Sequence, residues 1–123
     1  MRELGPADVR YDERGLVPAV VQHAGDGTVL MVGYMSAEAL VRTLASGDIW
    51  FWSRSRQALW HKGETSGNRL EVVSAATDCD RDTVLLQVRV QGKGMVCHNG
   101  TRSCFTEKLS LGKEAAQAEG SLS

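Results

Sequence analysis

Three carboxylates and one thiol lie within five consecutive residues, the segment 78–82 with the sequence DCDRD. Neighbouring carboxylates repel one another, so this segment favours a bound cation. Carboxylate oxygens suit Mg²⁺ or Ca²⁺, whereas a thiolate suits zinc, so the two residue types could serve two metals. On an extended backbone Asp78 and Asp82 would stand roughly 13 Å apart, at about 3.3 Å per residue, so the segment must curl if one ion is to meet all three carboxylates. The alternative is a solvated acidic turn.

A second candidate site is the segment 97–104, CHNGTRSC, in which six residues separate two thiols. Structural zinc sites are closed by four protein ligands, whereas catalytic sites have three and leave a position for water. The chain has three cysteines, so Cys79, Cys97 and Cys104 could supply a catalytic set. Two alternatives stay open: three buried, inert cysteines, and a closed structural site with His98 as the fourth ligand.

The segment 60–68, WHKGETSGN, has the composition of an anion-binding loop. Its glycines free backbone amides for contact with a ligand, its lysine adds a cation, and hydroxyl and amide side chains add short donors. This chemistry fits a phosphate, although the spacing of a Walker loop is absent and the alternative is a plain turn. The candidate phosphate ligands are Lys62, Thr65, Ser66 and Asn68.

Aromatic and cationic side chains surround the start of this loop. Trp50, Trp52 and Trp60 could stack on a purine, although tryptophans in strands usually pack in a core. Arg54 and Arg56 are further candidates for binding an anion.

The elements that must position these segments begin with a predicted hairpin. Residues 17–23 and 28–34 are rich in Val, Leu and Met, and the segment 25–27 between them (GDG) tolerates positive φ. Ser36 can then cap a helix that ends at Gly47. The predicted apolar stripe of this helix follows i, i+3, i+4, i+7 and consists of Ala37, Leu40, Val41 and Leu44.

Three further strands are predicted at 49–53, 70–77 and 84–90, and the segment 60–68 is predicted to be an ordered loop. In 84–90 apolar residues alternate with mostly polar ones, so one face of this strand should be buried. The fold class that follows is α+β, a mostly antiparallel β-sheet with one main amphipathic helix.

The chain has 123 residues, the length of one domain, and its apolar (42%) and charged (24%) fractions are those of a globular protein. We expect a single domain over 1–109 and a frayed or disordered tail over 110–123, where little can be buried. A formal net charge of −1 does not supply the cationic field of a nucleic-acid-binding protein, so a small-molecule partner is expected. Because no apolar stretch resembles a signal peptide or a membrane span, the expected location is the cytoplasm.

Four segments together resemble the phosphoribosyl-AMP cyclohydrolase family: 50–57 (WFWSRSRQ), 60–68, 78–82 and 97–105 (CHNGTRSCF). Their order and spacing also agree with the family, and the resemblance extends from about Leu16 to Phe105. It implies a hydrolase that opens the purine ring of phosphoribosyl-AMP at the N1–C6 bond, giving the formimino carboxamide ribotide. This reaction is the third step of histidine biosynthesis.

The resemblance also implies two metals and a homodimer. Magnesium would be bound by Asp78, Asp80 and Asp82, and zinc by Cys79, Cys97 and Cys104. The family forms an intertwined homodimer with shared zinc sites, so Cys79 of one subunit would join Cys97 and Cys104 of the other. Some members carry a fused pyrophosphohydrolase domain, for which a chain ending at Ser123 has no room, so we expect a single reaction step.

Zinc-bound water has a lowered pKa and can supply hydroxide to C6 of an N1-substituted adenine. His98, beside a zinc ligand, is the first candidate for the accompanying proton transfer, and His61 is the second. Magnesium, Lys62, the loop amides and Arg54 would position the two phosphates. The alternatives are a non-catalytic zinc module and a hydrolase of another nucleotide such as a deaminase, although the H-x-E and P-C-x-x-C pair of zinc deaminases is missing.

Overall fold

The first two strands form the predicted antiparallel hairpin in the computed structural model, which describes residues 3–112. β1 (Leu16–His23) pairs along its length with β2 (Val29–Ser36). The turn between them is closed by a hydrogen bond of 2.7 Å from His23 N to Thr28 O, and Gly27 has a φ of 79°. The prediction of a hairpin with a positive-φ turn is therefore confirmed.

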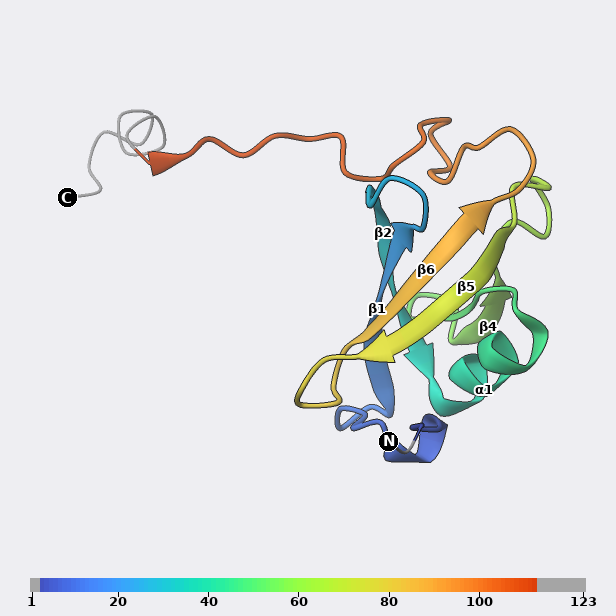
Figure 1. Cartoon of the computed structure of the whole chain (residues 1–123), viewed down its shortest axis with the longest axis vertical. Coiled ribbons are helices and arrows are strands. Elements are labelled where there is room, and N and C mark those ends of the chain that lie inside the picture. The colour runs from blue at the N-terminus through green and yellow to red at the C-terminus, as the bar shows by residue number, and fades with distance from the viewer. Residues whose placement is uncertain (1–2, 113–123) are drawn as a thin grey trace.

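β1 lies inside a four-stranded sheet with the order β2-β1-β6-β5 (Figure 1). β5 (Leu70–Thr77) and β6 (Val84–Val90) form a second antiparallel pair, whereas β6 runs parallel to β1. Val84, Leu86 and Val88 of β6 are buried, as their alternation predicts. The sheet is therefore mostly antiparallel, with a parallel pair at its centre.

α1 (Ala37–Ser46) follows β2 directly and has the predicted ends. The Ser36 hydroxyl accepts a hydrogen bond from Ala39 N at 3.1 Å, and Gly47 takes the left-handed conformation (φ 81°) in which helices commonly stop. Within residues 3–112 it is the one α-helix, beside a short 3₁₀ turn at Pro6–Asp8. The predicted α+β class is confirmed.

The buried face of α1 differs from the predicted apolar stripe. Three of the four predicted residues are exposed: Ala37, Val41 and Leu44. Ala39, Leu40 and Thr43 are buried instead. Thr43 can be buried because its hydroxyl donates to Ala39 O at 2.8 Å and accepts from Trp50 N at 2.9 Å. The side of the helix that faces the core thus depends on hydrogen bonds to the next strand, which the helical period does not reveal.

β3 (Trp50–Ser53) and β4 (Ala58–His61) form a second, separate hairpin next to α1 and β2 (Figure 1). The prediction of a loop over 60–68 is wrong at its start, because β4 continues to residue 61. The chain reverses at Gln57, which has a positive φ of 51°.

Ring contacts across this hairpin explain why β4 extends so far. Trp50 and His61 are cross-strand partners whose rings stack at 4.6 Å with an interplanar angle of 9°, and Phe51 meets Trp60 at 5.5 Å. Phe51 also joins the hairpin to the main sheet, because it is buried over Gly33 of β2. A Cβ at Gly33 would lie 2.5 Å from the Phe51 ring, so this packing requires glycine.

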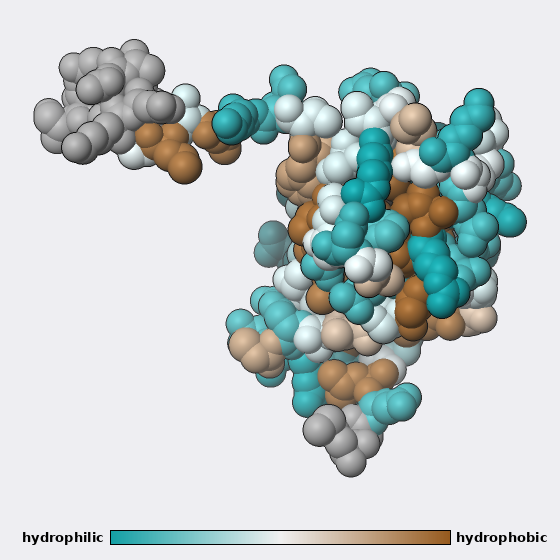
Figure 2. All heavy atoms as spheres, turned by 45° about the horizontal axis from the view of Figure 1, so that its top comes forward, coloured by the Kyte–Doolittle hydropathy of each residue, from teal (hydrophilic) through white to brown (hydrophobic). Residues whose placement is uncertain are grey.

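After residue 104 the chain leaves the domain in an extended course (Figure 1). Leu109 and Leu111 on this segment are 88% and 80% exposed, and Figure 2 shows apolar atoms on it. Most of the predicted tail, 110–123, lies outside the described residues, so its disorder stays a prediction, as does the boundary of the domain at residue 109. No helix within residues 3–112 is long and apolar enough to cross a membrane.

Candidate active site

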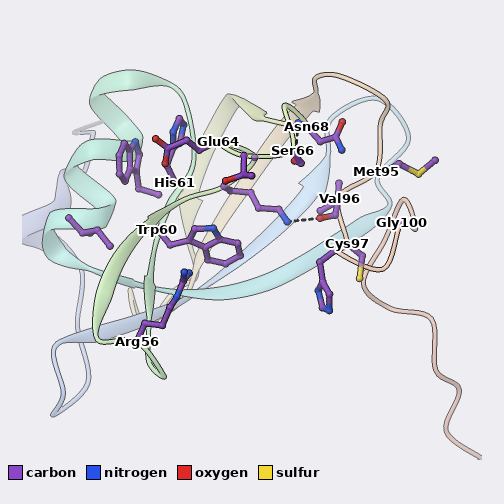
Figure 3. Close-up of a pocket in the computed structure, with 16 residues that line it drawn as sticks. Arg56, Trp60, His61, Glu64, Ser66, Asn68, Met95, Val96, Cys97 and Gly100 are labelled. Atoms are coloured by element: carbon purple, nitrogen blue, oxygen red, sulfur yellow. Dashed lines mark hydrogen bonds between the residues drawn. The ribbon is translucent and has the colours of Figure 1, made fainter.

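A hollow of about 550 Å³ opens between β4, the loop that follows it, and the segment 95–100 (Figure 3). It brings together most of the predicted site residues from two distant parts of the sequence. The first part contributes His61, Lys62, Thr65, Ser66 and Asn68, and the second contributes Cys97 and His98. Trp50 and Trp60 supply aromatic surface to the same hollow.

Lys62 joins the two parts of this pocket. Its Nζ donates a hydrogen bond of 2.5 Å to Val96 O, the residue before Cys97, and lies 5.4 Å from the centre of the Trp60 ring (Figure 3). Burial lowers the pKa of Lys62, and the nearby thiols of Cys104 and Cys97 partly oppose this effect. Lys62 therefore lies within the electrostatic reach of both cysteines.

The loop after β4 is held in shape by close backbone packing. Gly63 has a φ of 81°, and a Cβ there would lie 2.5 Å from Asn68 O. Gly67 N donates to Gly63 O at 2.8 Å, and the Asn68 side-chain Oδ1 accepts from Lys93 N at 2.8 Å. The Asn68 side chain thus links this loop to the turn after β6, which is a structural role beside its predicted contact with substrate.

Cys97 and Cys104 lie close enough together for each thiol to shift the pKa of the other. The pKa of Cys97 is lowered, chiefly because the Asn99 backbone N–H donates to its sulfur, and the Thr101 hydroxyl and the Lys62 charge act in the same direction. The pKa of Cys104 is raised, chiefly by burial and then by the neighbouring Cys97. Two adjacent sulfurs, one of them stabilised as thiolate, fit half of a zinc site.

The first hairpin fixes the position of this cysteine loop. Arg102 Nη2 lies 2.8 Å from Asp26 Oδ2, and Arg102 Nη1 donates to the Thr28 hydroxyl at 3.1 Å. Ser103 Oγ donates to Val29 O at 2.9 Å, and Cys104 N donates to Leu30 O at 2.7 Å in the main chain. Sequence reasoning missed these contacts, because nothing local links the two segments.

The acidic segment 78–82 curls into the turn between β5 and β6. Asp82 N donates to Asp78 Oδ1 at 3.1 Å, and Arg81 takes a positive φ of 62°. Desolvation raises the pKa of Asp78, but hydrogen bonds led by the one from the Asp82 backbone N–H outweigh it and lower the pKa. The pKa of Asp82 is raised, first by its hydrogen bond with the Asp78 carboxyl group. The segment therefore curls and brings the Asp78 and Asp82 carboxyl groups into contact, although within residues 3–112 the three carboxylates do not gather around one point. Carboxylate oxygens are the donor type that Mg²⁺ prefers.

The three cysteines of one chain do not meet at one point. The turn that carries Cys79 precedes β6, whereas Cys97 and Cys104 follow the far end of this strand (Figure 1). A strand of seven residues spans roughly 20 Å at about 3.3 Å per residue. Within residues 3–112 no three His, Cys, Asp or Glu side chains gather closely enough to hold a metal ion. One chain therefore offers two adjacent thiols in one place and the third thiol elsewhere.

The two arginines of the segment 50–57 have different surroundings. The structure does not bring Arg54 to the pocket, because its guanidinium lies 4.0 Å above the Tyr34 ring, beside a separate hollow that Arg14 and Trp52 also line. Arg56 lines the pocket instead. Both arginines lie in the turn between β3 and β4, so the course of this turn separates them.

The two candidate histidines are held differently. His61 Nε2 lies 3.3 Å from Asp48 Oδ2, and the stacked Trp50 covers its ring, so 14% of the side chain is exposed. His98 follows Cys97 directly and lines the pocket without a hydrogen bond to another residue in the described range 3–112. Asp48, which precedes β3, is a partner that the sequence pattern did not reveal.

Glu64 also lines the pocket and was missed. It belongs to the segment predicted to bind phosphate, where a carboxylate is out of place electrostatically. This unexpected negative charge was the signal in the sequence that could have identified Glu64 as a site residue.

The family profile described as phosphoribosyl-AMP cyclohydrolase matches residues 31–106. A protein with this name from Chelativorans is 62% identical over 102 residues, which cover 83% of this chain and 73% of the relative. Another from Dinoroseobacter shibae is 50% identical over 112 residues, covering 91% of this chain and 92% of the relative. A protein of Gloeobacter violaceus named histidine biosynthesis bifunctional protein HisIE is 59% identical over 96 residues, which cover 78% of this chain and 44% of the relative.

Proposed function

The chain belongs to the phosphoribosyl-AMP cyclohydrolase family, hydrolases of histidine biosynthesis, and on this premise we propose how its residues carry out the reaction. The enzyme hydrolyses the N1–C6 bond of phosphoribosyl-AMP in the cytoplasm, with zinc and magnesium bound. The observation that carries this proposal is the contact between Cys97 and Cys104 beside a pocket that holds Lys62 and His98.

Cys97 and Cys104 bind zinc, and Cys79 of a second copy completes the ligand set. The lowered pKa of Cys97 supports this role, because a metal-binding thiol must lose its proton. Three protein ligands are typical of catalytic zinc sites, so this set would leave room for a water molecule. When bound, zinc supplies a Lewis acid that lowers the pKa of that water.

The position of Cys79 supports a homodimer with two shared sites. This cysteine is exposed on the turn before β6, at the opposite end of the strand from the sulfur pair. In a dimer with a two-fold axis every contact is made twice, so each Cys79 would complete the partner's sulfur pair.

Magnesium binds to Asp78, Asp80 and Asp82 in the curled turn. The contact between the Asp78 and Asp82 carboxyl groups supports this, because two carboxylates held together are stabilised by a cation between them. In the dimer the same turn would stand beside the partner's pocket, where Asp78, Asp80 and Asp82 would hold a cation that neutralises the phosphates of the substrate.

The pocket's own side chains bind the substrate and move protons. Lys62 and Arg56 supply positive charge for the two phosphates, and Thr65, Ser66 and Asn68 supply polar contacts. Arg54 retains a role only if the substrate extends to its separate hollow. The reaction adds the water oxygen to C6, breaks the N1–C6 bond, and leaves the two water protons on N1 and on the exocyclic nitrogen.

Two histidines are available for these proton transfers. The ring of His98 is the first candidate to take the proton of the attacking water, because it lies next to a zinc ligand and is not held by another described residue. In a neutral His61 the Nε2–H donates to Asp48, which leaves Nδ1 as the atom that can accept a proton.

The experiment follows the ultraviolet spectrum of phosphoribosyl-AMP mixed with the purified protein, before and after removal of zinc. We expect ring opening that stops when zinc is removed and returns when it is added back. No spectral change from a folded, zinc-loaded dimer would overturn the proposed substrate.

A further inference from the structure

The pocket has one acidic side chain in surroundings that favour anions. Of its lining residues within 3–112, Glu64 is the one that carries a carboxylate, whereas Arg56 and Lys62 carry positive charge. A carboxylate facing a ligand with two phosphates would weaken binding unless it meets a positive group of that ligand. The charge of Glu64 is therefore unexplained by phosphate binding.

The backbone fixes where Glu64 stands. Its N–H donates to His61 O at 3.3 Å, and the hydrogen bond from Gly67 N to Gly63 O closes the loop around it. Its carboxylate makes no hydrogen bond or ion pair with another residue of the described range, so it is available to a ligand. Figure 3 shows Glu64 next to His61, with Trp60 lying between these residues and Arg56.

The Trp60 ring is the surface on which a bound purine would stack, between Glu64 and Arg56. An adenine ring stacked on the indole can lie with its N1–C6 edge on the side of Glu64 and the ribose phosphate of N9 on the side of Arg56. The edge of an N1-substituted adenine that reacts is an amidine, N1–C6–N6, which carries a positive charge when it is protonated. A carboxylate that accepts hydrogen bonds from a cationic amidine forms a charge-assisted pair.

We propose that Glu64 binds the protonated amidine edge of an N1-substituted adenine and so selects it over the neutral adenine of ordinary nucleotides. This inference rests on the proposed function, because it takes the pocket as the substrate site. The carboxylate stabilises the cationic form of the substrate, in which C6 is more open to attack by water than in the neutral form. No bond to Glu64 is made or broken. In the cationic form the exocyclic nitrogen already carries both protons of the product amide, so one proton of the water goes to N1 as the N1–C6 bond breaks, and the other goes to the base that takes it from the attacking water.

The test compares two ligands that differ by one methyl group, adenosine 5′-monophosphate and its N1-methyl derivative, whose base is cationic near neutral pH. Binding of each is measured by calorimetry to the zinc-loaded wild type, to Glu64→Gln and to Glu38→Gln. The last is the matched control, because Glu38 pairs with Arg42 on the surface of α1 and its substitution removes the same charge outside the pocket. Both ligands carry one phosphate, so phosphate binding cancels in the comparison.

We expect the wild type and Glu38→Gln to bind the methylated nucleotide at least tenfold more tightly than the unmethylated one, and Glu64→Gln to lose this preference. kcat/KM for phosphoribosyl-AMP should fall by a similar factor in Glu64→Gln. A wild type without the preference, or a Glu64→Gln variant that keeps it, would overturn the inference. Failure of the wild type to open phosphoribosyl-AMP would instead overturn the proposed function, and the binding comparison would still decide the role of Glu64.

Discussion

Arg102 of the cysteine loop lies 2.8 Å from Asp26 of the first hairpin turn, so two segments that are far apart in the sequence are joined next to Cys104. The pKa of Asp26 is held well below its usual range, first by the hydrogen bond from Thr28 N, then by the Thr28 hydroxyl and Arg102. The contact is exposed, so its main effect should be on position more than on global stability.

Asp26→Asn should weaken zinc binding about tenfold, because residues that orient metal ligands typically contribute that much. The Tm should fall by a few degrees at most. Because the folded pKa of Asp26 is depressed, its contribution is present above the ordinary carboxyl pKa near 4 and is lost as the pH falls below it. The Tm difference between variant and wild type should therefore be constant at neutral pH and shrink in acid. If Asp26→Asn binds zinc as tightly as the control variant Glu38→Gln, Asp26 does not help to position the cysteine loop.

Complementation between inactive variants tests the shared zinc site. Cys79→Ala and Cys97→Ala damage different halves of the site, so mixed dimers would contain one intact site of two. After subunit exchange the mixture should regain roughly a quarter of the wild-type activity, if half of the dimers are mixed. Cys97→Ala mixed with Cys104→Ala is the matched control, and it should stay inactive because both changes fall in the same half. Equal behaviour of the two mixtures would rule out sharing.

Gly63→Ala and Gly67→Ala separate backbone strain from steric conflict. Both glycines have a positive φ near 80°, which costs another residue about 1–2 kcal/mol. At Gly67 a Cβ meets nothing within 4 Å, whereas at Gly63 it would lie 2.5 Å from Asn68 O. Gly63→Ala should thus lower the free energy of unfolding clearly more than Gly67→Ala and should also raise KM, as measured by chemical denaturation and steady-state kinetics. Equal losses of unfolding free energy in the two variants would mean that the loop moves to make room for the Cβ at residue 63.

Lys62→Met should raise KM for phosphoribosyl-AMP about tenfold or more, because it removes a half-buried cation from the pocket while keeping the length of the side chain. The hydrogen bond to Val96 O would be lost as well, so a smaller fall in zinc affinity is expected. Lys93→Met serves as the control, since the Lys93 side chain is exposed and does not line the pocket. A KM equal to that of this control would contradict the role of Lys62 in binding phosphate.

Local patterns were sufficient for most of the elements and for the identity of the chemical groups. The alternation in β6, the Ser36 cap and the left-handed Gly47 follow from interactions within a few residues, and the structure confirms them. The segments 60–68 and 97–104 were likewise recognisable by composition, because each carries its donors and thiols in consecutive residues.

Contacts between distant segments could not be predicted from the sequence, because hydrophobic periodicity and secondary-structure propensity do not tell which elements touch. The end of β4 depends on rings stacked across the hairpin, and the burial of Thr43 depends on hydrogen bonds to β3. For the same reason Arg54 was preferred to Arg56, and Asp48 and Glu64 were missed.

By itself the sequence therefore determined which groups are available: three carboxylates in one turn, three cysteines, and a loop rich in donors. The tertiary structure decided their grouping. β6, an extended spacer roughly 20 Å long at about 3.3 Å per residue, separates the turn that carries Cys79 from the loop that carries the other two cysteines. Lys62 connects the donor loop to the cysteine loop.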